Sequence, residues 1–176
     1  MDKFAHAHYL TALPALVYED NLLAGVDGWA NTGDVPLREK TWDGDAIIDW
    51  QGLSITALQA AMNKRAIADA ELLINKCRQA LNTRIKRVYL LTHVPPSQAV
   101  TGIYPAKPLQ LRRSVYYSHA LGHALEKLAA CYRQIEFYLY SGHVHQGQLY
   151  QIGDNMQGQI AAAYRPNQPF TWVLLP

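Results

Sequence analysis

Two short apolar segments constrain the fold of this chain most strongly. "VYLL" (88–91) runs into Thr-His and then a Pro-Pro pair, and "FYLY" (137–140) runs into Ser-Gly-His. Apolar runs of this length between such stops are typical of buried strands, and proline cannot continue a strand ladder. The two segments therefore predict strands inside a sheet, each of which ends close to a histidine.

Two longer segments with helical periodicity, 54–81 and 114–134, alternate with these strands, and Ser54 is the expected N-cap of the first. Another buried strand is expected within 21–29. Four strand-like segments follow the second helix: 135–142, 147–152, 158–165 and 170–175. The expected apolar helix positions are Ile55, Leu58, Met62, Leu72, Leu73, Leu121, Leu125, Leu128 and Tyr132. This order predicts an α/β fold in which a mixed β-sheet is layered with helices, in a single domain over residues 1–176.

Composition narrows the class of protein. Hydrophobic residues make up 49% of the chain and the formal net charge is +2. A packed globular protein is expected, with no charge-based reason for a nucleic-acid partner. No apolar run is long enough for a bilayer span and the first residues do not resemble a secretory signal, so a cytoplasmic protein without a membrane partner is expected. Cys77 and Cys131 are expected to be buried free thiols, although the sequence leaves a disulfide open.

The histidines at the strand ends are the main functional signal. His93 and His143 each follow a buried strand, and the carboxyl edge of a sheet is where α/β proteins place their sites. His143 and His145 are two residues apart, so both side chains can face one side of an extended backbone, and Gly142 is expected to allow a sharp turn. Neutral imidazoles are good ligands for transition metals. The alternative is that these histidines are polar loop residues satisfied by hydrogen bonds.

Two further histidine pairs have spacings that could suit metal ligands. His6 and His8 repeat the two-residue spacing, but a terminal segment or the start of a helix is the better interpretation. His119 and His123 have the spacing of a helical metal pair, but Ala120 stands where a zinc protease carries glutamate. We expect both to lie on a polar helix face, opposite the leucine stripe.

Five sequence segments resemble the calcineurin-like metallophosphoesterases. "THVPP" (92–96) and "GHVH" (142–145) look like the last two metal motifs of that family, in the same order. "LLAGVDGWAN" (22–31) resembles the Gly-Trp segment found in many bacterial members. "SHALGHALEKLA" (118–129) and "YQIGDN" (150–155) resemble the helix before and the strand after the last motif. The resemblance extends from about residue 13 to residue 176.

The resemblance implies a site and an activity. It assigns His93 and His143 to one metal and His145 to a second, with two divalent transition metals (Mn, Fe or Zn) in the complete site. The implied function is a phosphoester hydrolase in which a metal-activated hydroxide attacks phosphate. The loop after His93 is expected to border the cleft, and Tyr104, Lys107, Arg112 and Arg113 are candidates for phosphate or base contacts. The alternative is an ordinary polar loop.

The chain departs from the family in its first half. The motifs Asp-x-His, Gly-Asp-x-x-Asp and Gly-Asn-His-Asp do not occur, and Gly33-Asp34 lacks the second aspartate. The bridging carboxylate and the catalytic histidine are therefore missing. We expect the C-terminal half of a metallophosphoesterase, arising from truncation, a late start codon or a split gene, that binds metal weakly and hydrolyses little alone. The alternatives are a non-catalytic fragment or scaffold, and a mononuclear zinc hydrolase built on the three histidines.

The implied family fold also makes a prediction about assembly. The family has a four-layer αββα sandwich, of which this chain would form one sheet and its helices. Its apolar inner sheet face would then lack a cover, and a homo-oligomer is expected to bury it. The alternative is that the two helices cover both faces of the sheet.

Overall fold

The computed structural model describes residues 9–31, 37, 47–100, 116–144 and 147–161, which form one six-stranded sheet in the order β1-β2-β3-β4-β6-β5. The strands are β1 (Leu16–Tyr18), β2 (Asn21–Gly25), β3 (Arg87–Leu91), β4 (Glu136–Ser141), β5 (Gln148–Ile152) and β6 (Met156–Ile160). β2, β3, β4 and β6 are parallel, while β1 and β5 pair antiparallel at the two edges. The predicted α/β class and mixed sheet are confirmed. The segment 170–175, expected as a strand, lies outside the described residues.

Two α-helices pack on the sheet, α2 (Ile55–Ala80) and α4 (His119–Cys131), and two short 3-10 turns, η1 (Ile48–Trp50) and η2 (Ser97–Val100), lie in the connections. Ser54 caps α2 as predicted, and its hydroxyl accepts a hydrogen bond from the amide of Ala57. The second helix begins at His119, later than predicted, because Ser118 is its N-cap. Neither helix in the described part of the chain has the length and hydropathy needed to cross a bilayer.

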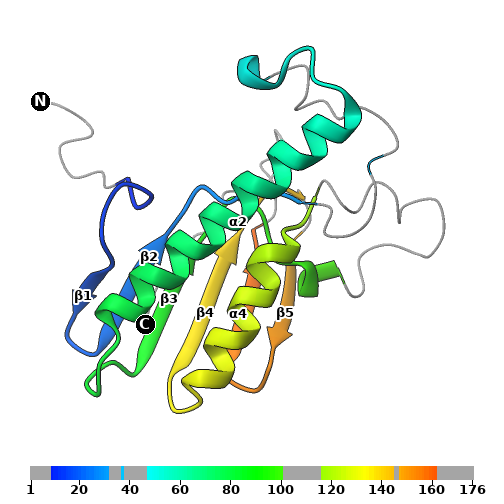
Figure 1. The fold of residues 1–176 in the computed structure, drawn as a ribbon. Helices are drawn as coiled ribbons and strands as arrows, with labels where there is room; N and C mark the ends of the chain where they lie inside the picture. Colours follow the sequence, from blue (N-terminus) through cyan, green and yellow to red (C-terminus); the bar gives the residue numbers. More distant parts are fainter. Residues whose placement is uncertain (1–8, 32–36, 38–46, 101–115, 145–146, 162–176) are drawn as a thin grey trace, which may run out of the picture.

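Both helices cover the same face of the sheet (Figure 1). Their buried side chains form one core with alternate residues of the strands. The helices contribute Leu73, Leu121, Leu125 and Leu128, and the strands contribute Leu22, Val88, Leu90, Phe137 and Leu139. One predicted core position was wrong. Leu72 is 38% exposed, because the buried side of α2 runs through Leu58, Met62, Ala66 and Leu73 instead.

The opposite face of the sheet, here called the helix-free face, carries the other set of alternating side chains. Tyr89 and Tyr138 stack there with ring centroids 5.3 Å apart. Leu91 is 38% exposed and Leu149 is 77% exposed. The alternative in which α2 and α4 cover both faces is therefore contradicted within the described residues.

The two thiols are both free but differ in environment. Cys77 packs in the core between α2 and the sheet, and burial raises its pKa to about 12. Cys131 is exposed at the end of α4, so the expectation that it is buried was wrong. The apolar stripe of α4 ends in Leu128 and Ala129, which leaves Cys131 on the outer side.

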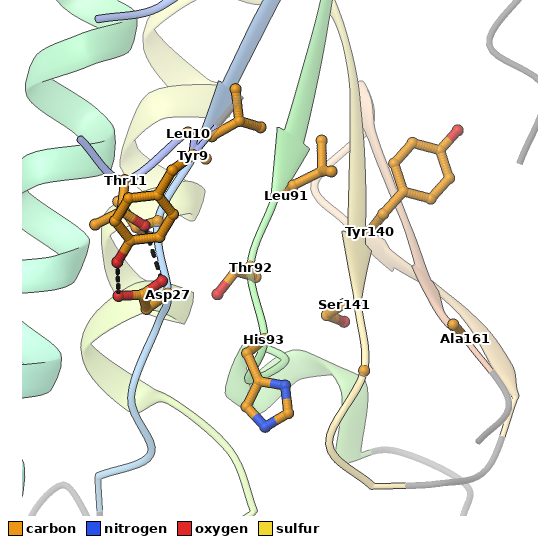
Figure 2. Close-up of a pocket in the computed structure, with 13 residues that line it drawn as sticks. Tyr9, Leu10, Thr11, Asp27, Leu91, Thr92, His93, Tyr140, Ser141 and Ala161 are labelled. Atoms are coloured by element: carbon orange, nitrogen blue, oxygen red, sulfur yellow. Dashed lines mark hydrogen bonds between the residues drawn. The ribbon is translucent and has the colours of Figure 1, made fainter. Parts of the chain in front are cut away.

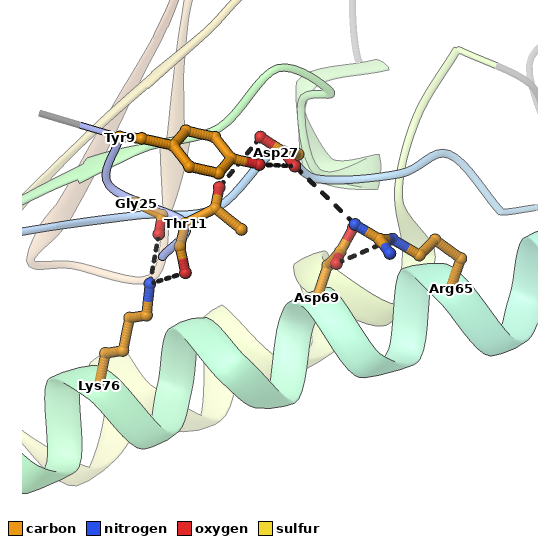
Figure 3. A network of polar contacts seen from close by, with 7 residues as sticks. All are labelled: Tyr9, Thr11, Gly25, Asp27, Arg65, Asp69 and Lys76. Atoms are coloured by element: carbon orange, nitrogen blue, oxygen red, sulfur yellow. Dashed lines mark hydrogen bonds and ion pairs between the residues drawn. The ribbon is translucent and has the colours of Figure 1, made fainter. Parts of the chain in front are cut away.

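A buried lysine supplies the hydrogen bond that β1 does not provide at the end of β2. β1 pairs only with residues 21–23, so the carbonyl of Gly25 has no strand partner on that side. The Lys76 ammonium donates to this carbonyl at 3.1 Å and to the carbonyl of Thr11 at 2.8 Å (Figure 3). It also donates to the carbonyl of Leu10 at 2.6 Å. Lys76 thereby fastens residues 9–12, here called the strap, to the edge of the sheet.

Replacing Lys76 with methionine should loosen the strap, because methionine fills similar space but leaves three carbonyl groups without their donor. We expect Lys76→Met to lower the free energy of unfolding by about 1–3 kcal/mol in urea titrations. Lys64→Met on the exposed side of the same helix is the matched control and should change it little. Equal stability of the two variants would contradict the role of Lys76.

Candidate functional site

The carboxyl ends of β2, β3 and β4 lie side by side, and backbone hydrogen bonds hold them together beyond the strands. The amide of His93 donates to the carbonyl of Asp27 at 2.8 Å, and the amide of Gly142 donates to the carbonyl of His93 at 2.9 Å. Three chemically active side chains thus follow three neighbouring strands: Asp27, His93 and His143. Asp27 was not predicted, although its position directly after a buried strand is the signal that identified His93.

The imidazoles of His93 and His143 meet at this edge. Nε2 of His93 lies 3.1 Å from Nδ1 of His143, and the ring centroids are 4.9 Å apart with the planes inclined at 76°. At this distance one ring donates its N–H to the bare nitrogen of the other, so the tautomers of the two rings are coupled, and either ring can be the donor. The predicted meeting of these two strand-end histidines is what the structure shows.

The backbone at His143 is held in an unusual conformation. His143 has φ = 68°, and the amide of Val144 donates to the carbonyl of Gly142 at 2.8 Å, which closes a three-residue γ-turn. This form of γ-turn is rare and strained for a residue with a side chain. The expectation that Gly142 makes the sharp turn was wrong. The Gly142 amide still donates a strand-type hydrogen bond to the carbonyl of His93, so the turn falls one residue later, at His143.

A glycine on the neighbouring strand end holds His93 in place from the other side. Gly28 has φ = 74°, and a Cβ atom there would lie 2.0 Å from Oγ1 of Thr92, the residue before His93. The hydroxyl of Thr92 in turn donates to the carbonyl of Val94 at 3.3 Å. The chain after β2 therefore packs directly against the backbone that carries His93, and only glycine permits this approach.

The N-terminus of α4 is joined to the same edge. The side chain of Asn31 accepts a hydrogen bond from the amide of Ala120 at 3.0 Å, and the hydroxyl of Ser118 accepts one from Leu121 at 3.2 Å. Ser118 also exchanges backbone hydrogen bonds with the turn at Pro95 and Ser97. Just before the helix, the ring of Tyr116 lies 5.8 Å from the ring of His143.

Asp27 faces the strap. Its carboxylate accepts hydrogen bonds from the hydroxyls of Tyr9 at 2.5 Å and Thr11 at 3.0 Å (Figures 2 and 3). The hydrogen bond to Asp27 raises the pKa of the Tyr9 phenol. Arg65 of α2 lies 3.8 Å from Asp27 but only 3.2 Å from Asp69, whose carboxyl pKa is raised by burial.

The other predicted site residues divide into two groups. His119 and His123 lie on the exposed side of α4, and Nδ1 of His123 is 3.9 Å from Glu126, in agreement with the predicted polar face. His6, His8, Tyr104, Lys107, Arg112, Arg113 and His145 lie outside the described residues. Among the residues that the structure describes, no group of three or more His, Cys, Asp or Glu side chains is placed to hold a metal ion.

Comparisons of the chain with protein-family models, with curated proteins and with solved structures found no match.

The close approach of Gly28 to Thr92 gives a test of how His93 is positioned. Gly28→Ala should both strain the backbone and push Thr92 away, so it should lower the free energy of unfolding by about 2 kcal/mol or more. Gly52→Ala is the matched control, since Gly52 also has a positive φ of 78° but nothing lies within 4 Å of its Cβ position.

The readout is the imidazole signals of His93 and His143 in NMR spectra, together with thermal unfolding. Gly28→Ala should shift both sets of signals, and Gly52→Ala should cost only the backbone strain. Relief of the Gly28→Ala defect by a second change, Thr92→Ala, would identify the Thr92 hydroxyl as the obstacle. If both single variants behave alike, the packing of Gly28 does not position His93.

Proposed function

We propose that this chain carries one wall of the metal site of a phosphoester hydrolase, as the resemblance to the metallophosphoesterases implies. The single observation that carries the proposal is the 3.1 Å separation between Nε2 of His93 and Nδ1 of His143 at the carboxyl edge of the sheet. The complete protein acts on a phosphoester substrate and uses divalent transition metals such as Mn, Fe or Zn.

The donor set and its spacing fit a metal of this type. Metal–nitrogen distances near 2.0–2.1 Å put two ligand nitrogens of one ion about 2.8–3.0 Å apart at octahedral angles and about 3.3–3.4 Å apart at tetrahedral angles. The observed separation of 3.1 Å lies between these two ideal values. His93 is exposed and His143 is half-buried, so an ion can reach both nitrogens from solvent.

The strain at His143 supports the same proposal. A non-glycine residue with positive φ costs folding energy, and such residues cluster at functional sites where a side chain must point in one direction. The positive φ falls at His143 and not at the adjacent Gly142, although glycine adopts positive φ without steric cost, and the ring of His143 lies against that of His93.

Two imidazoles are too few for a catalytic site. His145 is the proposed ligand of a second ion, and the carboxylates and the acid histidine of the family would come from a further polypeptide segment that forms a second sheet. Bound metals would clamp the phosphate and lower the pKa of the attacking water. His93 and His143 would hold and orient one ion, with Tyr104, Arg112 and Arg113 proposed to contact the substrate.

The helix-free face is proposed as the surface that this second sheet covers, which would complete the four-layer αββα sandwich. Leu91 and Tyr140 lie on that face directly beside the site. A second sheet that packs on this face would therefore also bring the missing metal ligands to the site. Without that cover we propose that two copies of the chain associate through the same face as a homo-oligomer.

Metal binding by the isolated chain is the first test. Zn²⁺ titrated into the full chain should bind weakly, and His143→Ala should weaken binding by about tenfold or more, which corresponds to about 1.4 kcal/mol. His119→Ala, at an exposed histidine on α4, is the control and should bind as the wild type does. Calorimetry with equal affinity for all three proteins would refute the assignment of His143.

Activity is the second test and requires the missing half. A polypeptide that carries Asp-x-His, Gly-Asp-x-x-Asp and Gly-Asn-His-Asp motifs in this fold should form a complex with the chain and hydrolyse a generic phosphoester such as 4-nitrophenyl phosphate when Mn²⁺ is present. His143→Ala in the complex should remove most of the turnover, while His119→Ala should retain it. Assembly without metal-dependent hydrolysis would favour the scaffold alternative.

A further inference from the structure

A pocket of about 470 Å³ opens beside His93 on the helix-free face (Figure 2). It lies over the ends of β2, β3 and β4, with the strap on one side and Ala161, which follows β6, on the other. His93 belongs both to the pocket lining and to the imidazole pair with His143. A group bound in the pocket would therefore lie next to a ligand held by the two histidines.

The floor of the pocket is apolar and shaped by a glycine. Leu10, Leu91 and Tyr140 supply most of it, and Gly25 lies between them. A Cβ atom on Gly25 would lie 3.0 Å from Leu10 and from the carbonyl of Leu91, so the bare glycine makes room for the strap to pack here. This surface suits the hydrocarbon part of an organic molecule.

The polar side of the pocket carries one negative charge. The side chain of Asp27 is 44% exposed, and its charge is only partly offset, because Arg65 stands 3.8 Å away and pairs more closely with Asp69. The hydroxyls of Tyr9 and Thr11 donate hydrogen bonds to the Asp27 carboxylate but carry no positive charge that would neutralise it. The described residues that line the pocket include no lysine or arginine.

A carboxylate beside aromatic and aliphatic surface favours a cationic organic group and disfavours a second phosphate or carboxylate. We propose that the pocket binds a positively charged organic group, such as a substituted ammonium. If the proposed function holds, this group belongs to the substrate: the phosphoester would lie at the histidines and its cationic part in the pocket beside Asp27.

Choline and its neutral isostere 3,3-dimethylbutan-1-ol provide a matched pair of probes that differ in charge but hardly in shape. Each is titrated into the isotopically labelled, metal-free full chain, and amide shifts are followed by NMR. Choline should shift residues 9–11, 25–27 and 91–93 and bind about tenfold or more tightly than the isostere. Because no metal and no turnover are involved, this result is independent of whether the proposed hydrolase activity exists.

Two variants test the charge. Asp27→Asn keeps the shape of the side chain and should weaken choline about tenfold, while Asp20→Asn, at the opposite end of β2, should leave it unchanged. Leu91→Lys places a positive charge on the partly exposed floor, on β3 and not on the strap, and should also abolish choline binding. Equal affinity for choline and the isostere, or unchanged choline binding in both Asp27→Asn and Leu91→Lys, would overturn the proposal.

Discussion

The in-register parallel pairing of β2, β3 and β4 is the constraint on which the site depends. Gly25 pairs with Leu91, and Leu91 pairs with Tyr140, so the three strands end at one level. Backbone hydrogen bonds then bring together the residues that follow them. A slip of one residue in either pairing would turn His93 or the His143 turn to the other face of the sheet.

The same pairing explains why both helices lie on one face. The chain runs from β2 through α2 to β3, and from β3 through α4 to β4, and each step moves to the next strand in the same direction. Parallel crossovers are right-handed in nearly all proteins, so two successive steps in one direction place their helices on the same side. The helix-free face follows from topology, and it is the face on which the pocket beside His93 opens.

Local patterns in the sequence predicted β2 to β6, both helices and the meeting of His93 with His143, because apolar runs, stops and caps are short-range signals. The short edge strand β1 was not predicted, and β6 lies at Met156–Ile160 instead of 158–165. Three features required the folded chain. Lys76 occurs in a long amphipathic helix where a lysine is ordinarily solvated, and its three carbonyl partners come from segments far away in sequence. The helical pattern predicted Leu72 as a core residue, but which side of α2 is buried depends on how the helix packs on the sheet and on α4. The left-handed backbone at His143 carries no signal, since the adjacent glycine is the obvious place for a turn.

The γ-turn at His143 sets stability against chemistry at a single position. Glycine and asparagine adopt positive φ more readily than histidine, so either would relax the backbone there. Neither would carry an imidazole toward His93. A library selected only for thermal stability should therefore enrich Gly or Asn at position 143, whereas a library selected for the proposed metal-dependent function should keep His at the expense of stability. The residue tolerated at this position thus reports which of the two properties a lineage has been selected to keep.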